Sequence, residues 1–99
     1  MADLLSNDIK KVICKNLAVN LPSLRAKVGL SQDELAGRLG FSRSTISAVE
    51  HGKREMQWST FMAIVLYFSK DKEIKELMIV MGIINDAVEE LINVEKRDF

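Results

Sequence analysis

The chain has 99 residues and no net charge, with 47% hydrophobic and 28% charged residues. This length suits one compact domain rather than two, and the composition is globular rather than disordered. No apolar run reaches the roughly 18 residues of a membrane span, and no secretory signal pattern is visible, so we expect no membrane partner. With Cys14 as the only cysteine, no internal disulfide is expected, which fits a cytoplasmic protein.

The charges are unevenly distributed along the chain. Residues 22–54 carry six basic and three acidic side chains, whereas residues 70–99 carry five basic and eight acidic ones. Because a local field acts on a charged partner more than the overall sum does, the first segment can face phosphate while the second faces away. Nucleic acid therefore stays open as a partner although the net charge is zero.

Apolar residues at helical spacing predict an all-α fold. The first predicted helix covers about residues 4–18, with its lysines mostly on the face opposite the apolar stripe. We expect it to end before Pro22, which lacks a backbone donor and disfavours helix in the preceding residue. Asn20 then caps a second helix, which carries Pro22 in its first turn and stops at Gly29.

The next two helices have the clearest boundaries. Ser31 and Glu34 form a capping box that starts a helix over residues 32–39. Gly40 ends this helix, and a short turn leads to another helix over residues 43–50. Helices of eight residues are unstable alone in water, so these two must pack on each other and on their neighbours.

Three more helices are predicted toward the C-terminus, over residues 58–68, 72–81 and 86–95. The first of them is apolar almost all round and should be buried on more than one side. Its residues Trp58, Met62 and Leu66 form a stripe. The first helix, the last helix or both can cover this stripe within one chain, or these helices can build a two-fold interface between two chains.

One segment resembles a known DNA-binding motif. Residues 32–51, QDELAGRLGFSRSTISAVEH, closely resemble the helix-turn-helix of the Cro/CI-type phage repressors, also called the XRE family. Residues 24–32 are similar to the first helix of that family and its link, and residues 50–54 to the start of its next loop. Residues 57–81 have the lengths of its last two helices.

The resemblance implies a lambda-repressor-like five-helix core with a helix-turn-helix at residues 20–81. This core lies within a single domain, 1–99, and has an N-terminal helical extension, 1–19, and a C-terminal one, 82–99. Members of the family mostly bind operator DNA, so the implied function is that of a bacterial or phage transcription regulator with double-stranded DNA as partner. One histidine and one cysteine make no zinc site, and no spacing suggests a nucleophile, so neither a cofactor nor an enzyme is expected.

The resemblance also implies roles in DNA binding, since the second helix of this motif presents its first residues to base edges in the major groove. Arg43 can bond a guanine through two atoms, whereas Ala48 can only touch a thymine methyl. The implied base-reading residues are Arg43, Ser44, Ser47 and Ala48. The implied phosphate-binding residues are Gln32, Ser42, Thr45, Lys53 and Arg54.

Some of these residues have a simpler interpretation as well. Ser42 serves as a helix cap whether or not DNA is present. Gln32, Arg43, Lys53 and Arg54 can be solvated surface residues. Arg25 and Glu50 resemble a pair that forms an internal salt bridge in many family members, so we expect this pair to be structural and Glu50 to make no DNA contact.

Helix-turn-helix proteins gain affinity by dimerising on a palindromic site, and we therefore expect a homodimeric repressor. Two alternatives stay open. One is an antitoxin that neutralises a protein partner and represses its own promoter. The other is a protein-interaction module that has kept the fold and lost DNA binding.

Overall fold

The computed structural model describes residues 2–97, which are helical and contain no strand. A short 3-10 helix, η1 (Ala2–Leu5), precedes the long helix α1 (Asn7–Val28). The helices that follow are α2 (Gln32–Leu39), α3 (Arg43–Glu50), α4 (Trp58–Phe68), α5 (Lys72–Val80) and α6 (Asp86–Arg97). The predicted all-α fold is confirmed, and α2, α3 and α4 have the predicted bounds.

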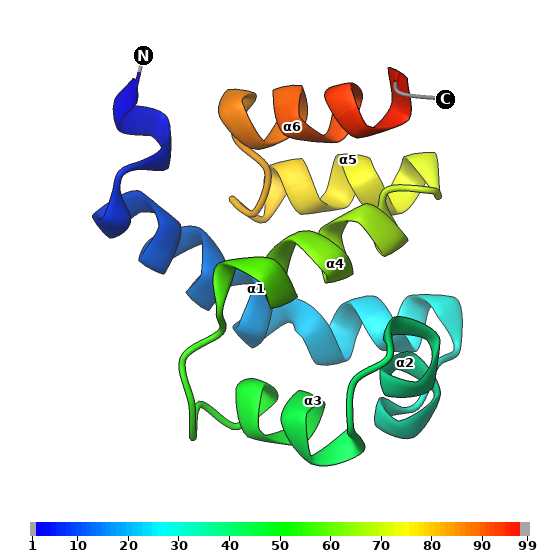
Figure 1. The fold of residues 1–99 in the computed structure, drawn as a ribbon. Helices are drawn as coiled ribbons and strands as arrows, with labels where there is room; N and C mark the ends of the chain where they lie inside the picture. The colour runs from blue at the N-terminus through cyan, green and yellow to red at the C-terminus, as the bar shows by residue number, and fades with distance from the viewer. Residues whose placement is uncertain (1, 98–99) are drawn as a thin grey trace.

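The helices are arranged in layers (Figure 1). In that view α6 lies over α5, α5 over α4, and α4 over the second half of α1, with α2 and α3 on the far side of α1. The helix-turn-helix pair is thus at the opposite end of the molecule from α6, whose first turn is acidic. Among residues 2–97, no helix combines the length and the apolar character required to cross a membrane.

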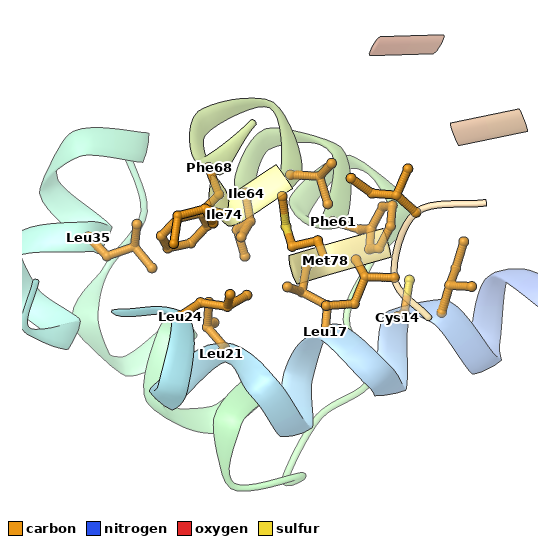
Figure 2. Packing of buried hydrophobic residues seen from close by; sticks show 14 of the residues in the cluster. Cys14, Leu17, Leu21, Leu24, Leu35, Phe61, Ile64, Phe68, Ile74 and Met78 are labelled. Carbon is orange, nitrogen blue, oxygen red and sulfur yellow. The ribbon is translucent and has the colours of Figure 1, made fainter. Parts of the chain in front are cut away.

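The core lies between α1 and the helices above it (Figure 2). One face of α1 points toward α4 and α5, and the side chains that meet there are almost fully buried. Burying one such side chain contributes roughly 1.5–3 kcal/mol, so this contact holds the layers together. Its largest members are Leu17, Leu21, Leu24, Phe61, Ile64, Phe68 and Met78.

The predicted helix break before Pro22 is wrong. Helix α1 runs without interruption from Asn7 to Val28 and contains the exposed Pro22, so the boundary expected between residues 19 and 20 falls inside one helix. A proline in a helix interior removes a backbone hydrogen bond and costs about 3 kcal/mol. The buried stripe of α1 continues on both sides of the proline, and its packing offsets that cost.

The apolar stripe of α4 is largely covered within one chain. Trp58, Met62 and Leu66 are half-buried and pack against the core, and the Trp58 ring stacks on Phe61 with centroids 4.7 Å apart. Among the described side chains, the large hydrophobic residues that remain exposed are on other helices. They are Val12, Val19, Val28, Ile79, Val80 and Val94.

Candidate nucleic-acid interface

Helix α2 begins with the predicted capping box and ends with a tight turn. The Glu34 N–H donates to Ser31 Oγ at 3.0 Å, and the Ser31 N–H donates to Glu34 Oε1 at 2.9 Å. Hydrogen bonding to Ser31, first from its backbone and then from its side chain, lowers the pKa of Glu34. At the other end Gly40 adopts a φ of 76°, in the left-handed region that glycine enters without steric cost. This turn redirects the chain into α3.

Buried apolar residues pack α2 and α3 against each other. Leu35 and Ala36 from α2 and Ile46 from α3 are almost fully buried and belong to the same core cluster. The methyl side chain of Ala36 leaves room for the two helix backbones to approach closely. Because this contact occupies one side of α3, the other side is left for solvent or a ligand.

The four implied base-reading residues share the side of α3 that faces away from this contact. Arg43, Ser44, Ser47 and Ala48 fall within roughly 140° of arc at 3.6 residues per turn. Arg43 and Ser44 are exposed, and Ser47 and Ala48 are half-buried. None of the four is acidic, so this surface of α3 offers one cation and two hydroxyls without a competing carboxylate.

Hydroxyl groups cluster at the N-terminus of α3. Ser42 Oγ accepts the Thr45 N–H at 3.1 Å, and it lies 3.0 Å from Ser44 Oγ and 2.9 Å from Thr45 Oγ1. Ser42 therefore caps the helix, as predicted. The helix dipole makes this end partly positive, which favours a phosphate or the electronegative edge of a base.

An ion pair at the end of α3 joins this helix to α1. Arg25 of α1 donates from Nε to Glu50 Oε2 at 2.7 Å and from Nη2 to Glu50 Oε1 at 2.9 Å. Arg25 also donates from Nη1 to the Leu30 carbonyl at 3.0 Å. Hydrogen bonding to Glu50 raises the pKa of Arg25. The Glu50 side chain is only 4% exposed, so this residue orients α3 and faces away from the solvent side.

Gln32 also binds this carboxylate, which sequence reasoning missed. Its Nε2 donates to Glu50 Oε1 at 2.8 Å, and the side chain is half-buried. Gln32, which the resemblance implied to bind phosphate, therefore uses one of its two amide hydrogens for the ion pair. The second amide hydrogen is what Gln32 can offer to DNA. The place of Gln32 in the first turn of α2 did not reveal this, because only packing brings the end of α3 beside it.

Two further polar contacts lie near the ends of α2 and α3. Arg38 of α2 donates from Nη1 to the Tyr67 hydroxyl of α4 at 2.8 Å. His51 Nδ1 lies 2.8 Å from the Ser47 carbonyl and 3.3 Å from its hydroxyl. A carbonyl only accepts, so Nδ1 carries the proton in this contact, and the imidazole caps the negative end of α3.

The loop after α3 holds two exposed cations near the end of the helix. The Lys53 N–H donates to the Ala48 carbonyl at 2.9 Å, and the Gly52 N–H donates to the Val49 carbonyl at 3.2 Å. These bonds fold the start of the loop back onto α3. Lys53 and Arg54 are exposed, and neither forms a salt bridge with any side chain in the described part of the protein.

A family model described as a helix-turn-helix domain matches residues 16–67, which is more than half of the chain. The chain belongs to the helix-turn-helix domain family. This membership is consistent with the resemblance to Cro/CI-type repressors and supports a DNA-binding regulator in general terms. No curated protein and no solved structure gave a significant match.

The match places the candidate interface inside the helix-turn-helix domain. It includes α2, α3 and the loop after α3 in full, and most of α1 and α4. All implied DNA-binding residues and the Arg25–Glu50 pair are within it. Helices α5 and α6 of this helix-turn-helix protein follow the matched segment.

Proposed function

We propose that this helix-turn-helix protein is a sequence-specific transcriptional repressor that binds a palindromic operator as a homodimer, with α3 in the major groove. The observation that carries the proposal is the outward side of α3. It presents the exposed Arg43 and Ser44 at its start, and its buried side is fixed by α2 and by the Arg25–Glu50 pair. A recognition helix requires both an accessible reading side and a defined orientation.

Base reading is assigned to the exposed side of α3. Arg43 can donate to both acceptors of a guanine in the major groove, which is the commonest specific contact. Ser44 and Ser47 can donate to or accept from base edges, although the Ser47 hydroxyl also lies near His51. Ala48 contributes a methyl group for a thymine methyl contact.

Phosphate binding is assigned to residues at both ends of α3. Ser42 and Thr45 stand at its positive end, where backbone N–H groups and hydroxyls suit an anion. Lys53 and Arg54 extend from the loop at the other end and can hold the backbone further along the groove. Gln32 adds its remaining amide hydrogen beside the start of α2.

We expect a dimer because a single recognition helix is short. One eight-residue helix reaches only a few base pairs, and two copies on a two-fold site extend the contact. The described surface offers exposed apolar side chains for association, among them Val80 at 83% exposure and Ile79 at 46% on α5. Repression then results from occupation of a promoter.

The test is in vitro selection of DNA sites from a random pool by the purified protein at physiological salt. We expect enrichment of an inverted repeat whose half-sites are separated by about one helical turn, or 10–10.5 base pairs. The Arg43→Ala variant, selected in parallel, should lose preference at one position of each half-site. Binding only at low salt with no enriched sequence would contradict the proposal and favour a function through a protein partner.

A further inference from the structure

A groove of about 520 Å³ opens between the first half of α1 and the chain that links α3 to α4. Its α1 side is formed by residues 7, 10, 11, 14, 15 and 18, a spacing that places them on one face of the helix. The opposite side includes Val49 at the end of α3, Met56 of the loop and Trp58 at the start of α4. The volume falls in the range of about 300–1,000 Å³ found for small-molecule sites.

The lining combines an apolar interior with cationic edges. Cys14 and Val49 are buried, and Met56 and Trp58 are half-buried. The charged residues of the lining are Lys10, Lys11, Lys15, Arg54 and Glu55. The lining therefore contains four cationic side chains and one carboxylate. None of the four forms a salt bridge with any side chain that the structure describes.

One of the cations is held against the aromatic wall of the groove. Lys10 Nζ lies 4.8 Å from the centre of the Trp58 ring, and the Trp58 and Phe61 rings are stacked with centroids 4.7 Å apart. The Cys14 thiol adds an uncharged surface, because burial, partly offset by Lys10, raises its pKa to about 11. The interior thus suits a hydrocarbon or aromatic body, with cations placed for an anionic group at its end.

We propose that this groove binds a small organic carboxylate with an apolar body. Charge complementarity favours an anion, and the apolar interior distinguishes this ligand from the phosphates of DNA, which need cations but no hydrophobic wall. An organic carboxylate uses both parts of the lining at once. Its carboxylate accepts from lysine or arginine at the edge, and its body covers Trp58 and Met56.

The groove is also linked to the DNA-binding elements, a step that rests on the proposed function. Val49 belongs to α3, and Arg54 is one of the two loop cations assigned to phosphate. A carboxylate bound beside Arg54 competes with the DNA backbone for this guanidinium. Ligand binding should therefore weaken DNA binding, which makes the groove an effector site.

The first test uses Trp58, the only tryptophan of the chain, as a fluorescent reporter. Phenylbutyrate, phenylbutanol and inorganic phosphate serve as probes, since they separate the anion from the apolar body. We expect a saturable fluorescence change with phenylbutyrate and an affinity about tenfold lower for phenylbutanol, because the charged hydrogen bond is lost. Inorganic phosphate should neither change the signal nor displace phenylbutyrate.

Matched variants locate the site. Lys11→Gln and Lys15→Gln change exposed lysines of the groove and should each weaken phenylbutyrate binding about fivefold to tenfold. Lys27→Gln changes an exposed lysine of the same helix outside the groove and should have no effect. Ala18→Phe, which fills the groove from α1, should abolish the signal. Urea unfolding of each variant checks that the fold is kept.

The outcomes separate this site from the proposed function. Equal binding of phenylbutanol, displacement by phosphate at similar concentrations, or no effect of the lysine substitutions would overturn the carboxylate site. With a DNA duplex obtained by selection, phenylbutyrate should raise the Kd of the natural protein and not that of the Lys11→Gln, Lys15→Gln double variant. Failure to bind any duplex would refute the regulator function and leave the fluorescence result standing.

Discussion

The guanidinium of Arg25 in α1 donates to both carboxylate oxygens of Glu50 at the end of α3, at 2.7 and 2.9 Å. Gln32 in α2 donates to the same carboxylate at 2.8 Å. Three helices are thereby joined at one buried group. An eight-residue helix cannot hold its own position, so the orientation of α3 depends on this contact and on the apolar packing against α2.

Glu50→Gln should therefore destabilise the protein. The amide keeps the shape of the side chain but leaves the charge of Arg25 without its counter-ion. Breaking a fully buried pair costs about 3–5 kcal/mol, and because Arg25 keeps some contact with water we expect a loss of about 2 kcal/mol in the free energy of unfolding. Urea denaturation measures it.

Two further variants complete this measurement. Glu76→Gln changes an exposed carboxylate of α5 and should alter the free energy of unfolding by less than about 0.5 kcal/mol. Combining Arg25→Met with Glu50→Gln should cost less than the sum of the single losses, because the two residues interact. Strict additivity would show that the pair does not stabilise the fold.

Arg43→Ala should lower both affinity and specificity for DNA. Removing a two-atom contact to guanine costs roughly 1–3 kcal/mol and relaxes the preference at that base pair. Fluorescence anisotropy with the selected site and with single-base variants of it measures both effects. Lys72→Ala, an exposed lysine of α5 at the other end of the molecule, is the control. Unchanged affinity and preference for Arg43→Ala would remove this residue from base reading.

Lys53→Ala should weaken binding to all sequences by a similar factor. A lysine that neutralises one phosphate displaces counter-ions, so its loss lowers the slope of log Kd against log salt by about one. The measurement is a salt titration with the selected site and with an unrelated duplex. An unchanged slope would mean that Lys53 is a solvated surface charge.

Local signals allowed the helix-turn-helix to be predicted closely. The capping box at Ser31, the left-handed Gly40 and the cap at Ser42 are encoded within a few residues of the helix ends that they define. The bounds of α2 and α3 therefore agree with the prediction. The Arg25–Glu50 contact came from family resemblance, since no local rule links residues 25 positions apart.

Features that depend on packing between distant segments could not be predicted from such local signals. A proline rule predicts a break at Pro22, but the rule does not weigh the buried stripe that continues through it. Gln32 was predicted to bind phosphate or to be a solvated surface residue, and its hydrogen bond to Glu50 was missed because the end of α3 reaches it only in three dimensions. The groove escaped notice because it requires the loop after α3 to lie beside α1.

The continuity of α1 leads to a prediction for Pro22→Ala. Alanine restores the backbone donor at this exposed position and fits the helix without changing a buried contact. The helical preference of alanine over proline is about 3 kcal/mol, partly offset because the unfolded chain becomes more flexible, so we expect a gain of about 2 kcal/mol. A loss of stability in urea denaturation would indicate that the chain breaks at this residue.

Burial of Cys14 predicts a loss of stability at high pH. The pKa of the thiol rises to about 11 in the folded protein, mainly through burial, from an ordinary value of 9.0. Between these two values the unfolded chain releases its thiol proton while the folded chain keeps it. The stability that the protonated thiol contributes is therefore complete below pH 9 and decreases toward pH 11. We expect a decrease of at most about 2 kcal/mol in the free energy of unfolding over this window. Cys14→Ala removes the thiol and keeps every other titratable group, so the difference between the two pH profiles isolates the thiol. Parallel profiles would show that the thiol ionises alike in the folded and unfolded chains.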